Sequence, residues 1–215
     1  MFNDRQVASV LQKLHELYPN LKHYLNFSNP VELLVATILS AQVRDTVVNE
    51  VTIPLFKKYK SAQDFAKADI EDIVAIVKKV TFANNKAKYI KEACSLLVDE
   101  HGGKVPRTVE ELTKLPGIGK KTAHAILQNA FDIVEGVVVD THGLRLSYRL
   151  GWTDTDKNAD KAERQLCDVV PKKEWKELPW LFKEHGRAIC KAPVPTCSIC
   201  PISDLCPKRG VVKHK

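Results

Sequence analysis

The sequence lacks any long apolar run: no stretch approaches the roughly 18 apolar residues that a membrane-spanning helix needs. It also lacks the apolar stretch of a secretory signal, because the first five residues, MFNDR, already carry charge. These absences argue against a membrane protein and predict a cytosolic or nuclear one, cytoplasmic and associated with the nucleoid if the source is prokaryotic. Thiols stay reduced in such compartments, so the 6 cysteines are not expected to form disulfides.

Strand patterns are almost absent. Residues 137–139 (VVV) are the only clearly extended segment and are too short to build a sheet. Residues 47–53 are rich in β-branched side chains and are compatible with a strand, which Pro54 would interrupt. Nearly every other periodic segment repeats its apolar residues at helical spacing, so the sequence predicts an all-α protein. Among the expected helices are those over about 30–41, 119–131, 141–150 and 179–189.

The composition narrows the class of partner. With 215 residues the chain suits one large domain or two small ones. Lys and Arg number 33 against 26 Asp and Glu, and the net charge of +7 favours a polyanion over an acidic partner. Charged and apolar residues are mixed along the whole chain, which excludes wholesale disorder.

A short segment between two expected helices has the properties of an anion site. Residues 115–123 read LPGIGKKTA, and the helix before them begins with a capping box at Thr108. Pro116 cannot continue that helix, and Gly117 and Gly119 allow positive φ and close approach of the backbone. Amides of the turn and of the next helix would then point towards one bound phosphate. An ordinary helix–helix turn is the simpler interpretation, but the basic residues that follow favour the phosphate site.

Lys121 is in an unfavourable place for a cation, because the first turn of a helix carries the positive end of the dipole. One interpretation is a second phosphate contact beside Lys120. The other is catalytic: the dipole, the charge of Lys120 and partial burial would together favour a neutral, nucleophilic amine. Such an amine can attack a sugar carbon and hold the product as a Schiff base.

Asp140 follows the extended residues 137–139 and precedes an expected helix, so it is predicted to be the N-cap. A capping carboxylate is ionised and held rigidly, which is also what is needed beside a developing positive charge on a sugar. His142, Arg145 and Arg149 share one face of the helix that follows, and a solvated basic face is the preferred interpretation for them.

Four of the cysteines fall in one C-terminal segment with the spacing C-x6-C-x2-C-x5-C, namely Cys190, Cys197, Cys200 and Cys206. In a reducing compartment such a group predicts a metal or cluster site. Four thiolates suffice for a [4Fe–4S] cluster. Zinc is the alternative, although zinc sites usually combine two close cysteine pairs and this segment has one. Cys94 and Cys167 lie inside helical patterns and are expected to pack in the core.

The hairpin with Lys121, followed nineteen residues later by Asp140, resembles the endonuclease III family of helix-hairpin-helix DNA glycosylases with abasic-site lyase activity. The resemblance extends to residues 39–42 (LSAQ), 84–87 (NNKA) and 185–187 (HGR), and so spans nearly the whole chain. The cysteine spacing matches that of the family's [4Fe–4S] site, which favours this cluster over zinc.

The resemblance implies two helical domains flanking a DNA-binding cleft. The first is a helical barrel over residues 23–133, with the helix-hairpin-helix motif at about 108–131. The second is discontinuous: it joins residues 1–22 to 134–215 and carries the cluster at 190–206.

By the same resemblance, Lys121 is the nucleophile and Asp140 activates it and stabilises the departing base. Gln42 and Phe82 lie in the loops that fill the space of the extruded base, although a polar helix end and ordinary core packing explain them equally. The predicted activity is removal of oxidised pyrimidines from duplex DNA, followed by β-elimination at the abasic site, by a monomer. Further contacts to DNA are expected from Gly117, Gly119, Lys120 and Lys191.

Departures from the family pattern leave the substrate open. Thr81 stands where glycine is usual, Ala83 where tyrosine is frequent, and Lys191 is the only basic residue in a loop that is often richer in them. A thymine-specific mismatch glycosylase of the same superfamily therefore remains an alternative. A non-catalytic iron–sulfur protein that binds DNA is a second one, disfavoured by the presence of both Lys121 and Asp140.

Overall fold

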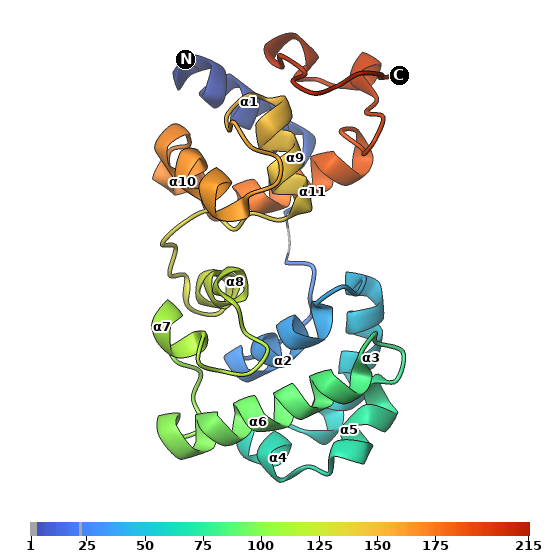
Figure 1. Ribbon diagram of the computed structural model, residues 1–215, viewed down its shortest axis with the longest axis vertical. Helices are drawn as coiled ribbons and strands as arrows, with labels where there is room; N and C mark the ends of the chain where they lie inside the picture. Colours follow the sequence, from blue (N-terminus) through green and yellow to red (C-terminus); the bar gives the residue numbers. More distant parts are fainter. Residues whose placement is uncertain (1–3, 22) are drawn as a thin grey trace. The chain divides into compact units, whose positions relative to one another are not determined.

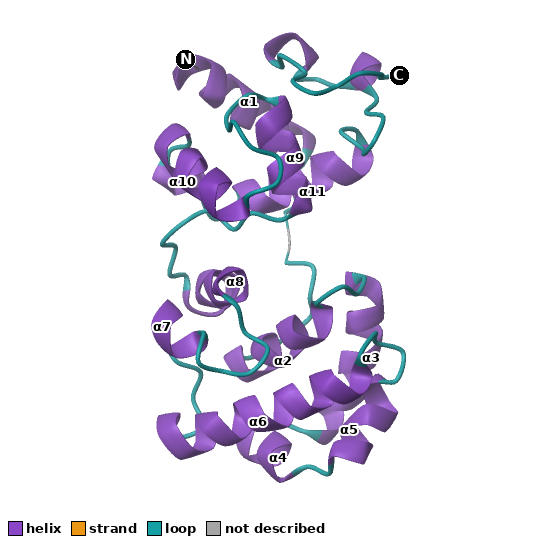
Figure 2. Cartoon of the chain, in the orientation of Figure 1, coloured by secondary structure: helices purple, strands orange, loops and turns teal. Residues whose placement is uncertain are grey.

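The computed structural model describes residues 4–21 and 23–215, and every regular element in these ranges is a helix (Figure 2). The all-α prediction is confirmed. None of the described helices is both long enough and apolar enough to span a bilayer. The chain divides into two compact units, residues 23–133 and residues 1–22 with 134–215. Of the segment expected to begin the second domain, residues 1–3 and 22 lie outside the described ranges.

The unit of residues 23–133 is built around α6, which contacts α2, α4 and α5, while α8 packs on α2 and α7 (Figure 1). One continuous apolar core runs through it. Its helices are α2 (Pro30–Ser40), α3 (Asp45–Lys58), α4 (Ala62–Lys67), α5 (Ile70–Val77), α6 (Ala83–His101), α7 (Val109–Leu112) and α8 (Lys120–Phe131).

Helix α2 begins where its sequence predicts. The Asn29 side chain accepts a hydrogen bond from the Glu32 amide at 3.0 Å, and Pro30 occupies the first turn, where its missing N–H costs nothing. Most side chains of α2 are buried, including Leu33 and Leu34, which are fully enclosed. A helix that is apolar on nearly all sides belongs in the centre of a core.

Residues 47–53 form part of α3 and no strand. Val48, Val51 and Leu55 recur at helical spacing and are buried in the core, and this packing outweighs the preference of β-branched residues for strands. Pro54 lies inside the helix, where it has no amide to donate to the preceding turn.

In the other unit, α11 packs on α9 and α1, and α9 also contacts α10. A separate apolar core lies between these helices. The elements are α1 (Asp4–Leu17), α9 (Thr141–Arg149), α10 (Ala159–Val169), the 3-10 turn η1 (Lys172–Glu174), α11 (Leu178–Ala188) and the 3-10 turns η2 (Cys197–Ile199) and η3 (Ser203–Leu205).

Two backbone features of this unit adjoin helix α9. Residues 137–139 form no strand; they are an irregular segment anchored by the buried Val137 and Val139. Helices α9 and α11 approach closely at Gly186, where a Cβ atom would collide with the ring of His142. Only glycine, which has no side chain, therefore fits at this position.

Candidate active site and cysteine cavity

The hairpin between α7 and α8 has the compact backbone that its sequence predicts. Gly117 has a φ of +81°, and a Cβ atom there would lie 3.3 Å from the ring of Tyr89, so the position requires glycine twice over. Gly119 is different from the expectation: its φ is −93° and a Cβ atom would meet nothing within 4 Å. Gly119 caps α8 without a side chain, which leaves open space at the helix end.

The first turn of α8 contains Lys120 and Lys121 and no acidic residue. Both lysines are exposed, so the expected partial burial of Lys121 is wrong. The first amides of a helix have no partner within it, and two cations at this end increase its positive potential. The terminus is therefore suited to an anion such as a DNA phosphate.

Asp140, in the unit of residues 1–22 and 134–215, is the N-cap of α9. Its Oδ1 accepts a hydrogen bond from the Gly143 amide at 2.7 Å. Buried Val139 fixes the chain immediately before it, and the carboxylate itself is half-buried. The cap thus holds one oxygen of Asp140 in place and leaves the other for a different task.

The face of α9 that carries His142, Arg145 and Arg149 is not the solvated surface that was expected. Arg149 is 8% exposed, and Arg145 Nε donates to the carbonyl oxygen of Cys190 at 3.0 Å. Burial lowers the pKa of His142, and the negative charge of Asp140 opposes this shift without outweighing it. These side chains connect α9 to α11 and to the cysteine segment.

Gln42 and Phe82 lie on two neighbouring loops of the unit 23–133. The Thr81 hydroxyl donates a hydrogen bond to the carbonyl oxygen of Gln42, at 3.4 Å, so the loops touch. Both Gln42 and Phe82 have a φ of 58°, a strained conformation for residues other than glycine, and the Phe82 side chain is 64% exposed. Phe82 is therefore not part of the core, and its exposure is typical of a binding residue.

A buried lysine fixes the first of these loops. Lys86 on α6 is 5% exposed, and its Nζ donates to the carbonyl oxygens of Leu39 at 2.8 Å and Ala41 at 2.6 Å. Burial lowers the pKa of Lys86. The ammonium satisfies carbonyls at the C-terminal end of α2, directly before Gln42, and complements the negative end of that helix dipole.

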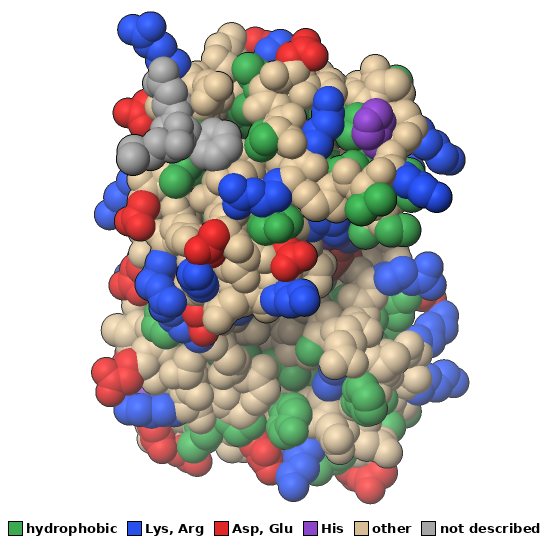
Figure 3. Space-filling view, turned by 45° about the horizontal axis from the view of Figure 1, so that its top comes forward, with side chains coloured by type: hydrophobic (Ala, Val, Ile, Leu, Met, Phe, Trp, Pro, Cys, Tyr) green, Lys and Arg blue, Asp and Glu red, His purple; other side chains and the backbone are tan. Residues whose placement is uncertain are grey.

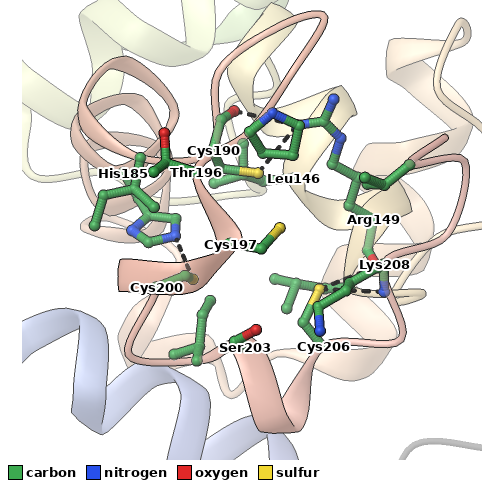
Figure 4. A pocket seen from close by; sticks show the side chains of 15 residues that line it. Leu146, Arg149, His185, Cys190, Thr196, Cys197, Cys200, Ser203, Cys206 and Lys208 are labelled. Atoms are coloured by element: carbon green, nitrogen blue, oxygen red, sulfur yellow. Dashed lines mark hydrogen bonds between the residues drawn. The ribbon is translucent and has the colours of Figure 1, made fainter. Parts of the chain in front are cut away.

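All four clustered cysteines line one cavity in the second unit, and Figure 4 shows them around a common space. Apolar side chains such as Leu146 and Ile202 form part of its wall. An arginine and a backbone amide donate to sulfur atoms: Arg149 Nη1 donates to Cys190 Sγ at 3.2 Å, and the Lys208 amide donates to Cys206 Sγ at 3.4 Å. Hydrogen bonds of this kind stabilise thiolate ligands of metals.

The arrangement suits a multi-atom cluster better than one ion. Among the described residues no group of three or more His, Cys, Asp and Glu side chains converges closely enough to hold a single metal ion. A zinc ion would need its four sulfurs within about 2.3 Å of one point, which leaves no cavity between them. Burial raises the pKa of Cys200 to about 11 and also raises that of Cys206, and binding of a metal to the sulfurs would oppose this shift.

His185 on α11 is the other polar group at this cavity. It is 1% exposed, and its Nε2 lies 3.4 Å from Cys200 Sγ (Figure 4). Its Nδ1 lies 3.1 Å from the hydroxyl oxygen of Tyr18. Burial lowers the pKa of His185 to about 4, and burial together with Glu184 raises that of Tyr18 to about 12. Both shifts favour the uncharged forms of the two side chains.

Positive charge is spread widely over the molecule. Figure 3 shows lysine and arginine side chains across the face in view, with acidic ones interspersed. Lys191, within the cysteine segment, exposes its side chain while Arg149 Nη1 donates to its carbonyl oxygen at 2.9 Å. Its backbone is therefore fixed and its charge is accessible to a polyanion.

Sequence reasoning gave no role to four residues that the structure places at functional positions. Lys86 and His185 lie inside two motifs that carry the family resemblance, and these motifs were the only sign in the sequence that the two residues have a role. Arg149 was assigned to a solvated face, and Tyr18 belongs to none of the motifs. Their contacts all join segments far apart in the chain.

Comparison with known families defines the class. Residues 35–172 match the HhH-GPD superfamily of base excision DNA repair proteins, over more than half of the chain. The helices and the glycine hairpin within this range are therefore those of a helix-hairpin-helix DNA repair protein.

Curated relatives narrow this further. Endonuclease III of Synechocystis sp. is 42% identical over 94% of this chain and 92% of its own length. Endonuclease III of Bacillus subtilis is 38% identical over 100% of both chains. A solved structure of a trapped endonuclease III–DNA covalent intermediate has 36% identity and a TM-score of 0.89, covering 97% of each chain. The chain belongs to the endonuclease III family and is a base excision repair DNA glycosylase and abasic-site lyase.

Proposed function

We propose that this enzyme removes oxidised pyrimidines from duplex DNA, acts as a monomer, and uses Lys121 as its nucleophile. The observation that carries this assignment is the first turn of α8, which combines Lys120 and Lys121 with no acid. A cation at the positive end of a helix is destabilised, and this favours the neutral amine that nucleophilic attack requires. Lys120 then serves as the phosphate contact.

The reaction follows from the chemistry of an amine at a sugar carbon. Lys121 Nζ forms a bond to C1′ as the bond between C1′ and the base breaks, and the base leaves with the bonding electrons and takes up a proton. The C1′–O4′ bond then opens: its electrons leave on O4′, which takes a proton from water, and the nitrogen lone pair forms the C=N bond of a protonated Schiff base. Loss of a proton from C2′ then expels the 3′ phosphate oxygen, which is the β-elimination step.

Asp140 contributes a fixed negative charge to the same reaction. The Gly143 amide holds one carboxylate oxygen at 2.7 Å, so the group does not have to be ordered when the substrate binds. We assign to it stabilisation of the positive charge that develops on the sugar as the base departs, and activation of the amine.

Two parts of the unit 23–133 are assigned to DNA binding. The hairpin of Gly117 and Gly119 would bind backbone phosphate without reading sequence. The loops of Gln42 and Phe82 would fill the space that the extruded base leaves. Their strained backbone and the exposure of Phe82 support this role. Lys191 would add a phosphate contact from the cysteine segment.

A [4Fe–4S] cluster is the cofactor that the cysteine cavity fits. Its ligands would be Cys190, Cys197, Cys200 and Cys206, whose sulfurs surround a shared cavity and form no single-ion site among the described residues. When bound, the cluster would cross-link the C-terminal segment and supply redox chemistry. Arg149 and Lys208 would donate hydrogen bonds to its ligands.

The assignment of the nucleophile is tested by strand cleavage on duplex DNA with one abasic site. Lys121→Ala is expected to lower the cleavage rate by at least about 100-fold, within the range that nucleophilic or acid–base groups contribute. Lys120→Ala is the matched control, because it removes the neighbouring charge and should weaken binding in a salt-dependent way while cleavage persists. Equal loss in both variants would contradict the assignment.

Asp140→Asn separates capping from catalysis. Asparagine retains the oxygen that accepts from Gly143, so the thermal stability should change little, whereas removal of the base should fall sharply because the charge is lost. A panel of duplexes with oxidised thymine, oxidised cytosine and a G·T mismatch establishes the substrate. Preferential cleavage of the mismatch would replace the proposed substrate with thymine.

A further inference from the structure

We infer that His185 is a positioning residue for the cluster ligand Cys200, and that the hydroxyl of Tyr18 fixes the tautomer of His185 that does this. The inference rests on the cluster proposed above. It concerns a chain of two hydrogen bonds that links the end of α1 through α11 to one sulfur of the cavity, with all three residues in one unit.

The geometry of the imidazole allows both contacts at once. His185 Nε2 lies 3.4 Å from Cys200 Sγ and Nδ1 lies 3.1 Å from the Tyr18 hydroxyl oxygen, with the two rings edge to face at 6.0 Å. The side chain is 1% exposed, so water does not compete for either nitrogen. Both nitrogens therefore depend on these two partners.

The direction of the two bonds follows from the state of the sulfur. A cysteine that binds iron is a thiolate and has no proton to donate, so the shared hydrogen must belong to His185 Nε2. Full burial, with a phenol and not a carboxylate at Nδ1, favours the uncharged ring, in which Nδ1 accepts and the hydroxyl of Tyr18 donates to it. Tyr18 thus selects the tautomer that binds the thiolate, as second-shell partners of metal ligands generally do.

The backbone of His185 acts on a second ligand. Its carbonyl oxygen accepts from the amides of Ile189 at 2.9 Å and Cys190 at 2.8 Å. One residue therefore holds the turn that presents Cys190 and donates to the sulfur of Cys200. Substituting the side chain leaves the first contact in place, so variants at this position test the hydrogen bond to sulfur separately.

A donor to a cluster thiolate stabilises the more negative, reduced form and raises the reduction potential. His185→Leu is expected to lower the potential of the purified holoprotein and to accelerate cluster loss to a chelator by about 10-fold, in line with typical effects of outer-shell partners. Tyr18→Phe should change both quantities in the same direction but less. His185→Gln is expected to rescue both, because its amide nitrogen can occupy the place of Nε2.

The experiment combines voltammetry, resonance Raman of the iron–sulfur stretches and chelator kinetics on the wild type and these variants, with Tyr59→Phe, a buried tyrosine of the other unit, as the control. In the His185→Gln background, Tyr18→Phe should change neither the potential nor the rate of cluster loss further. Glutamine has no tautomers, so the hydroxyl of Tyr18 has none to select. Identical potentials and spectra in wild type and His185→Leu would overturn the inference, as would failure of His185→Gln to differ from His185→Leu. A wild type without iron would overturn the proposed cofactor as well, whereas a normal cluster in an insensitive His185→Leu overturns this inference alone.

Discussion

The two units of the chain reach order by different means. In residues 23–133 one apolar core joins α2 to α8, and large side chains such as Leu33 and Phe65 are fully enclosed. In the other unit the core is smaller, and Cys190, Cys200 and Cys206 only pack against its edge. The C-terminal segment after α11 contains only short 3-10 turns. Apolar burial therefore suffices to position the hairpin, whereas the cysteine segment is expected to depend on the proposed cluster.

Loss of a proposed cluster ligand is expected to have the largest effect, and to act on the cysteine segment alone. Cys197→Ala should prevent cluster binding and remove protection from amide hydrogen exchange in residues 189–211, while α2 and α6 keep theirs. Cys167→Ala is the control, since this cysteine is not among the residues that line the cavity. Exchange that accelerates equally in both units would contradict the separation, and so would unchanged exchange throughout.

A cavity in the larger core should destabilise residues 23–133 and leave the cysteine segment unaffected. Phe65 is 0% exposed, and Phe65→Ala is expected to lower the free energy of unfolding of residues 23–133 by about 3–5 kcal/mol. Chemical denaturation followed by the absorbance of the cluster and by circular dichroism measures the two units in parallel. The cluster should remain bound when the helical signal of the first unit is lost, and simultaneous loss would show that the units unfold together.

Many local features were predictable from the sequence because their causes lie within a few residues. The N-caps Asn29 and Asp140 both follow from side-chain chemistry next to a helical pattern, and the prediction for Asp140 is confirmed. The all-helical fold follows from apolar spacing, and the cysteine spacing indicates that a shared cavity is possible.

Contacts between distant segments could not be predicted in this way. Arg149 has the sequence environment of a surface residue, yet the crossing of α9 with the cysteine segment buries it. His185 is buried by α1 and by the turn near Cys200, neither of which is near it in the chain. The helix over residues 47–53 forms because Val48 and Val51 pack in a core that other segments provide.

A smaller effect is expected from the buried lysine that holds the Gln42 loop. Lys86→Met removes two hydrogen bonds from a charged donor and should cost about 1.5–3 kcal/mol of stability. It should also weaken binding to duplex DNA with an abasic site, because the loop after α2 is no longer fixed. Lys88→Met, on the exposed side of the same helix, is the control. Equal effects of the two substitutions would contradict the anchoring role.

Two glycines of the smaller unit test how tightly α9 and α11 pack at their crossing. At Gly186 a Cβ atom would collide with His142 and lie 2.9 Å from Arg145 Nη2, so Gly186→Ala should cost about 1–3 kcal/mol. At Gly136 an added Cβ would meet only the end of the Glu163 side chain, which can move, and Gly136→Ala should change stability by less than about 0.5 kcal/mol. Thermal melts of both variants measure the difference, and similar melting temperatures would disprove tight packing at Gly186.

The central claim, that Lys121 bonds to the sugar, is tested most directly by locating the bond. The wild-type enzyme is incubated with abasic-site duplex and borohydride, which reduces a Schiff base to a stable amine, and the digested adduct is mapped by mass spectrometry. The sugar remnant is predicted on Lys121, with none on the adjacent Lys120. A remnant on Lys120, or a trapped adduct of undiminished yield in Lys121→Ala, would contradict the account.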